Sequence, residues 1–140
     1  MERTRVLVVA NRTAATPLLL DEVHRRAESS PCRFTLLIPD ADTRTSADWT
    51  LDAALPELER AAGAPVSGVV GGRFALEAVY DTLRAGEYDE VIVSTLSRRF
   101  SRWLHRDLPG RIRAMGFPVT VVAPDGRHVD HRAAVGVFDQ

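Results

Sequence analysis

The chain has 140 residues, the size of a single domain, and its net charge of −1 gives no general electrostatic attraction to nucleic acid. It contains no lysine, which excludes Schiff-base chemistry and a Walker-type lysine, and its one cysteine, Cys32, excludes an intrachain disulfide and a thiolate metal cluster. No apolar run approaches the roughly twenty residues of a membrane span and no signal-peptide profile precedes the first strand, so we expect a cytoplasmic protein without a membrane partner.

The first part of the chain alternates between strand and helix signals. Residues 5–10 form a continuous apolar run, which is typical of a central parallel strand, and Asn11-Arg12-Thr13 then turn the chain. A helical pattern follows over about 16–27, with Pro17 in its first turn. Residues 33–38 predict a second strand that ends at Pro39-Asp40.

The middle of the chain repeats this alternation. Asp48 is a plausible N-cap for a helix that ends at Gly63, and Pro56 inside that pattern predicts either a kink or a start nearer Leu55. Residues 66–70 predict a third strand, which Gly71-Gly72 end, and residues 74–84 a third helix.

The most informative stretch runs from residue 90 to residue 122. Its apolar run at 91–93 predicts a buried strand that ends in Ser94 and Thr95. A helical pattern capped by Ser97 is expected to follow over Phe100–Leu108, with Pro109 breaking or kinking it. The helix start is rich in arginine, and such a start after a strand favours an anion. Residues 117–122 predict the fifth strand.

These elements predict the fold class. Five apolar runs alternating with helices indicate a three-layer α/β/α sandwich with an open, mostly parallel, five-stranded sheet. Right-handed crossovers restrict the topology to a handful, of which we expect the strand order 3-2-1-4-5. We expect one domain over residues 1–122. Residues 123–140 are then a C-terminal tail with weak apolar positions at Val135, Val137 and Phe138. This tail could form an edge strand, a dimer contact or no ordered structure.

In such a sheet, ligands bind at the carboxyl ends of the strands, where the strand order reverses. That rule places the crevice between the turns that follow the first and fourth strands. The candidate ligand-binding residues are Asn11, Arg12, Thr13, Asp40, Gly71, Gly72, Ser94, Thr95, Ser97, Arg98 and Arg99. Asn11 and Asp40 suit the edge of a base, the hydroxyls suit ribose or phosphate, and Arg98 or Arg99 supplies the countercharge.

Each candidate has a purely structural alternative. Asn11 and Thr13 also fit an Asx turn with a helix cap, and Gly71-Gly72 also fit a strand-to-helix turn. The arginines after Ser97 also fit the solvated outer face of a surface helix.

Residues 6–122 resemble a universal stress protein domain, of the adenine-nucleotide-hydrolase-like fold. The resemblance is carried by the turn at Asn11-Arg12-Thr13, the strand at 89–94 and the final strand at 117–122. It implies a stress-response regulatory module that holds ATP or AMP in the crevice without catalysis. We also expect a homodimer through the last strand and the tail, since an edge strand can pair with its symmetry mate.

The sequence departs from the motif of the nucleotide-binding branch of that family. Asn11 stands where that branch has an acid, Ser94 and Ser97 fall near its two glycines, and Asp107 falls near its final Gly-Ser. A carboxylate at Asp107 would repel a polyphosphate. A divergent, nucleotide-free dimeric interaction domain is therefore the competing interpretation.

Other chemistry has weaker signals. Thr13-Ala14-Ala15-Thr16 faintly resembles a flavodoxin phosphate loop, with Trp49 or Trp103 available to stack on FMN, although the spacing of Trp103 favours core packing. His128 and His131, together with Asp130, could bind a metal ion weakly, but they lie in the tail and no third ligand is anchored there. We therefore predict no metal site. We find no nucleophile elbow and no paired carboxylates, and we predict no enzyme activity.

Overall fold

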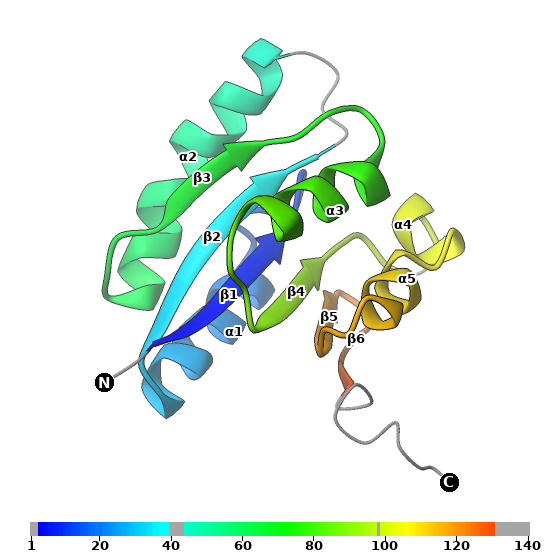
Figure 1. Cartoon of the computed structure of the whole chain (residues 1–140). Helices are drawn as coiled ribbons and strands as arrows, with labels where there is room; N and C mark the ends of the chain where they lie inside the picture. The colour runs from blue at the N-terminus through cyan, green and yellow to red at the C-terminus, as the bar shows by residue number, and fades with distance from the viewer. Residues whose placement is uncertain (1–2, 40–43, 98, 131–140) are drawn as a thin grey trace, which may run out of the picture.

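The computed structural model describes residues 3–39, 44–97 and 99–130, which form a layered α/β fold around one sheet (Figure 1). The strands are β1 (Thr4–Val9), β2 (Cys32–Ile38), β3 (Ser67–Val70), β4 (Glu90–Ser94), β5 (Val119–Ala123) and β6 (Gly126–Asp130). The helices are α1 (Pro17–Ser29), α2 (Arg44–Ala62), α3 (Ala75–Ala85), α4 (Arg102–His105) and α5 (Leu108–Ala114).

The sheet has the order β3-β2-β1-β4-β5-β6, and its first five strands in that order are parallel. This confirms the predicted α/β fold and the predicted order of five strands. Strand β6 adds a sixth, antiparallel strand, with Ala123 paired to Gly126 across a tight hairpin.

Two apolar cores lie on opposite faces of the sheet, because successive side chains of a strand point to opposite sides. Val6 and Val8 of β1 pack with α1 and α2, whereas Leu7 and Val9 pack with α3 and α5. Figure 1 shows the same division, with α3 and α5 covering one face and α1 and α2 lying behind the other. Each interior strand is therefore apolar along its length, as the sequence pattern indicates.

Part of the segment predicted as a tail forms an edge strand, which is one of the alternatives that the sequence left open. Strand β6 pairs with the whole of β5, so the edge of the fifth strand is already occupied within the chain. The predicted homodimer through the last strand and the tail would therefore have to use β6 and not the edge of β5, and it stays a prediction. Residues 131–140, which include Val135, Val137 and Phe138, lie outside the described residues.

Helix α2 begins earlier than the sequence predicts. It starts at Arg44 and continues through Pro56, so the expected start near Leu55 is wrong and Asp48 lies inside the helix. Gly63, which follows the helix, has φ +70°, the left-handed conformation that glycine tolerates best.

The amino ends of the strands are joined by ion pairs, the most buried of which centres on Arg26 of α1. Its guanidinium contacts Glu22, whose side chain is 1% exposed, at 2.9 Å, and it also pairs with Glu90 of β4. A further bond of 2.6 Å joins it to Oγ1 of Thr120 in β5. One side chain therefore ties α1 to two neighbouring strands.

A second, exposed ion pair fixes the start of β1. The backbone N–H of Arg5 donates to the Asp89 carboxylate at 2.8 Å, and its guanidinium contacts Asp89 and Glu87. These hydrogen bonds from Arg5 hold the pKa of Asp89 below its ordinary value of 3.8. None of the described helices combines the length and apolar character that a membrane span requires.

Replacing Arg26 should destabilise the fold more than replacing an exposed arginine. Arg26→Ala leaves Glu22 buried with a weakened set of partners, so we expect the free energy of unfolding to fall by about 3 kcal/mol or more. Arg60→Ala, which breaks an exposed pair with Glu57, is the control and should change it by less than about 1 kcal/mol. Urea denaturation measures both, and equal losses would contradict the role of Arg26.

The Asp89 pair predicts a pH dependence. Because the pKa of Asp89 is lower in the folded state than in the unfolded chain, its contribution is present above about pH 4 and is lost as the pH falls through the folded-state value. Asp89→Asn should therefore reduce stability slightly at neutral pH and flatten its decline in acid. The exposed Asp81, which forms no ion pair with a described residue, provides the Asp81→Asn control in the same denaturation series and should leave the acid decline unchanged.

Candidate functional site

The turns after β1 and β4 meet at the carboxyl edge of the sheet. Oγ1 of Thr13 and Oγ of Ser94 lie 2.8 Å apart in a buried hydrogen bond, which joins the two turns directly. Asn11 donates from Nδ2 to the carbonyl oxygen of Pro39 at 2.8 Å, so the first turn is also held to the end of β2. The crevice expected from the strand order therefore exists at the predicted place.

A second pair of buried hydroxyls fixes the segment after β4. Thr95 and Ser101 share a hydrogen bond of 2.5 Å, and Ser101 also accepts from the backbone N–H of Leu104 at 3.1 Å. Ser101 is the N-cap of α4, so this bond sets where the short helix begins relative to β4.

A cavity of about 490 Å³, here called the polar cavity, opens between these two turns. Its size falls within the range of small-molecule sites. Most of its lining residues are hydroxyl, amide or guanidinium side chains, with three apolar residues beside α4. They are Asn11, Arg12, Thr13, Ser46, Thr50, Ser94, Thr95, Leu96, Phe100, Ser101, Arg102 and Trp103.

A second hollow of about 510 Å³, here called the alanine hollow, adjoins the polar cavity between the turn after β1 and α2. The two spaces share Asn11, Arg12, Ser46 and Thr50 in their walls. The rest of the alanine hollow is formed mainly by small apolar side chains and one indole, and its remaining lining residues are Ala14, Ala15, Thr45, Trp49, Ala53 and Ala54.

Each pair of buried hydroxyls keeps one O–H group that donates no hydrogen bond within the pair. In each pair one hydroxyl gives its only proton to the other, and the accepting hydroxyl keeps its own proton for a further acceptor. Within the described part of the chain, no other acceptor is bonded to the hydroxyls of Thr13, Ser94, Thr95 or Ser101. The cavity must supply those acceptors, either as water or as ligand oxygens.

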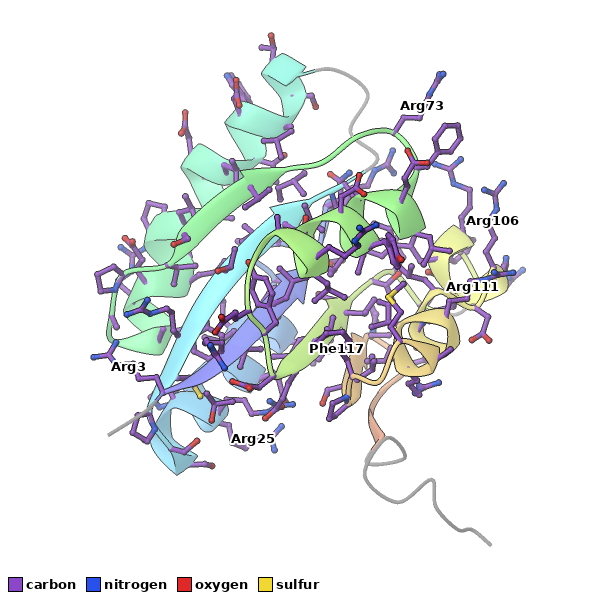
Figure 2. The ribbon with its side chains drawn as sticks, viewed as in Figure 1. Arg3, Arg25, Arg73, Arg106, Arg111 and Phe117 are labelled. Carbon is purple, nitrogen blue, oxygen red and sulfur yellow. The ribbon has the colours of Figure 1, made fainter. Side chains whose placement is uncertain are left out.

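The charges divide between the two ends of the sheet. Ion pairs among the described residues lie toward the amino ends of the strands, around Arg5 and Arg26. At the carboxyl end, Arg12, Arg106 and Arg111 are exposed and form no ion pair with a described acid. Figure 2 shows the side chains of Arg106 and Arg111 on the side of α4 and α5, far from Arg25. This end of the molecule favours an anionic ligand.

Five of the predicted site residues line the polar cavity, namely Asn11, Arg12, Thr13, Ser94 and Thr95. Four described candidates line neither space, namely Gly71, Gly72, Ser97 and Arg99. Asp40 and Arg98 lie outside the described residues. The prediction did not include the lining residues of α2 and α4, although Arg102 and Trp103 of α4 lie within the stretch 90–122 that the sequence analysis found most informative.

The predicted helix from Ser97 to Leu108 is wrong, because the chain forms two shorter helices there. Ser101 caps α4, which has four residues, and Asp107 then takes the left-handed conformation with φ 55° before α5. Phe100 precedes α4 and is 67% exposed, with the Arg99 guanidinium 5.6 Å from its ring centre. The expected anion site at the start of a long helix is therefore absent from the described residues.

Asp107 has a structural role. Its carboxylate accepts from the backbone N–H of Gly110 at 3.2 Å and caps α5, and it is not among the residues that line the polar cavity. The sequence predicts that the Asp107 carboxylate repels a polyphosphate, but this carboxylate does not line the polar cavity. Asn11 and Thr13 do not cap α1. The N-cap of this helix is Thr16, whose side chain makes no capping hydrogen bond.

The two glycines after β3 have different roles. A Cβ at Gly71 would lie 2.6 Å from the Cβ of Ala78 in α3, so the absence of a side chain lets helix and strand pack closely. A Cβ at Gly72 would meet no atom within 4 Å. Gly71 therefore fits the strand-to-helix turn that was its structural alternative.

No group of three or more histidine, cysteine or carboxylate side chains is placed to hold a metal ion among the residues that the structure describes. His131 lies outside those residues.

A scan of the chain against models of known protein families gives no match, and a search of curated proteins gives no relative. The site is therefore assessed from its geometry.

The two glycines form a matched pair for a stability test. Gly71→Ala should lower the free energy of unfolding by about 1–3 kcal/mol, because the added methyl group overlaps Ala78. Gly72→Ala should be neutral or stabilise the fold by up to about 1 kcal/mol through the unfolded chain. Chemical denaturation compares the two, and an equal loss in both variants would show that the contact with Ala78 is not limiting.

Proposed function

We propose that the chain is a universal-stress-protein-like ligand-binding module that holds an adenine nucleotide, ATP or AMP, at the polar cavity. The observation that carries the proposal is the meeting of the β1 and β4 turns, through Thr13 and Ser94, at the edge of a cavity of suitable size. This is the point where the strand order reverses and where open α/β sheets bind ligands.

The lining chemistry supports an anionic, oxygen-rich ligand. Arg12 and Arg102 supply guanidinium groups, which match phosphate geometry well. The two hydroxyl pairs supply further donors, as argued above. Phosphate and ribose oxygens satisfy both kinds of group at once, whereas a purely apolar ligand would leave these donors without acceptors.

The same lining supports binding without catalysis. Among the described residues that line the polar cavity, there is no histidine and no carboxylate to act as a general base. The buried hydroxyls of Thr13, Ser94, Thr95 and Ser101 are bonded to one another, so no base activates any of them as a nucleophile. We therefore expect no turnover of a bound nucleotide.

FMN is the second candidate ligand. Trp49 lines the alanine hollow beside the turn at Thr13-Ala14-Ala15-Thr16, which is where a flavin ring and its phosphate would lie next to each other. A cytoplasmic location and a regulatory role in stress remain predictions from the sequence. A homodimer also remains a prediction, and in this fold it would have to use β6 or another surface.

Addition of a nucleotide should raise the melting temperature of the protein. At one hundred times its dissociation constant a ligand adds about 2.7 kcal/mol, which is on the order of 9 °C for a chain of this length. Thermal shift with ATP, AMP and FMN compares the candidates, and prolonged incubation with ATP measures turnover. The absence of a shift with every nucleotide would favour the nucleotide-free interaction domain.

The arginines provide the matched variants for this experiment. Arg12→Ala and Arg102→Ala each remove a guanidinium from the cavity wall and should lower the affinity for the nucleotide about tenfold or more. Arg111→Ala removes an exposed arginine of α5 that lines neither space, and it should leave the affinity unchanged. Equal loss in all three variants would indicate a diffuse charge effect.

A further inference from the structure

Trp49 is the most exposed large apolar side chain among the described residues, at 78%. It lies near the start of α2, where the helix passes the turn after β1, and it takes no part in either apolar core. Folding therefore does not account for an indole at this position. Exposed aromatic side chains beside a hollow commonly mark binding sites.

The surface next to Trp49 is suited to a flat ring. The lining of the alanine hollow includes Ala14 and Ala15 from the turn after β1, and Ala53 and Ala54 from α2. Because alanine side chains are short and apolar, they leave a smooth wall without donors that a ring would have to satisfy. An aromatic ring placed there would have one face against the alanine side chains and the other against the Trp49 indole, so both faces would be removed from water.

The alanine hollow is continuous with the polar cavity through shared wall residues, among them Arg12. An apolar compartment with an aromatic edge thus opens directly on a compartment with guanidinium and hydroxyl donors. A ligand that is planar and apolar at one end and anionic at the other would match both.

We propose that the ring system of the ligand stacks on Trp49 in the alanine hollow while its phosphate lies in the polar cavity against Arg12 and Arg102. This inference rests on the proposed nucleotide binding and adds to it the position of the ring and the residue that holds it. Stacking of this kind selects for a flat ring and discriminates weakly between ring systems, so AMP and FMN should both use it.

Phe100 is the competing position for the ring. It lines the polar cavity and is exposed, but the Arg99 guanidinium already lies 5.6 Å from its ring centre. Trp103 lines the same cavity and packs against the core beneath α5, so its indole is already covered in part by protein.

The test compares AMP with ribose 5-phosphate, which carries the same phosphate and sugar without a ring. Calorimetry on the full chain should show AMP binding at least about fivefold more tightly than ribose 5-phosphate, since stacking on an aromatic residue raises affinity about 5- to 150-fold. Trp49→Ala should remove that preference and leave the affinity for ribose 5-phosphate unchanged. The control is Phe74→Ala, which removes an aromatic side chain, 61% exposed, that lines neither space, and it should alter neither affinity.

Fluorescence gives an independent readout, because the chain has two tryptophans. In a Trp103→Phe background Trp49 is the sole tryptophan, so AMP should quench the tryptophan emission while ribose 5-phosphate should not. Retention of the AMP preference in Trp49→Ala, or its loss in Phe100→Ala alone, would overturn the proposed ring position. Equal binding of AMP and ribose 5-phosphate by the wild-type chain would overturn it while leaving phosphate binding intact. Binding of neither would overturn it as well, and the nucleotide proposal would fall with it only if ATP also gave no thermal shift.

Discussion

The constraint on which the site depends is the reversal of strand order, which takes place in the crossover from β3 to β4. The chain runs outward from β1 through β2 to β3 with α1 and α2 on one face, then returns to the other side of β1 with α3 on the opposite face. Right-handed crossovers require this change of face. The segments after β1 and β4 therefore leave the sheet in opposite directions, and the space between them becomes the polar cavity, which the bond between Thr13 and Ser94 closes at its base.

The two ends of the sheet have different roles. At the amino ends, Arg26 and Arg5 are held by carboxylates on neighbouring elements, so their charges serve the fold. At the carboxyl ends, the guanidinium of Arg12 lies in the wall of two adjoining spaces. In a chain with no lysine, arginine thus forms ion pairs at one end of the sheet and lines the two spaces at the other.

The sequence predicts the strands and the fold class from local patterns, namely continuous apolar runs separated by helical ones. The strand order and the location of the crevice depend in addition on general rules for crossovers and for open parallel sheets. It could not predict that Ser46 and Thr50 reach the cavity, since this depends on α2 beginning at Arg44 and passing the turn after β1. The helix expected from Ser97 fails for a local reason. The left-handed backbone of Asp107 interrupts a pattern whose spacing alone looks continuous. The role of Gly71 depends on Ala78, a contact that only the packed structure reveals.

The β5–β6 hairpin also affects how the protein behaves when it is concentrated. Without it, the sheet would end in β5, an apolar strand whose five residues are all buried and whose unpaired backbone groups would offer a template for aggregation. With β6 in place, the sheet is bounded by that strand and by β3, which has four residues. The hairpin therefore removes the buried, apolar β5 from the edge of the sheet, where its backbone groups would be open to pairing with another chain.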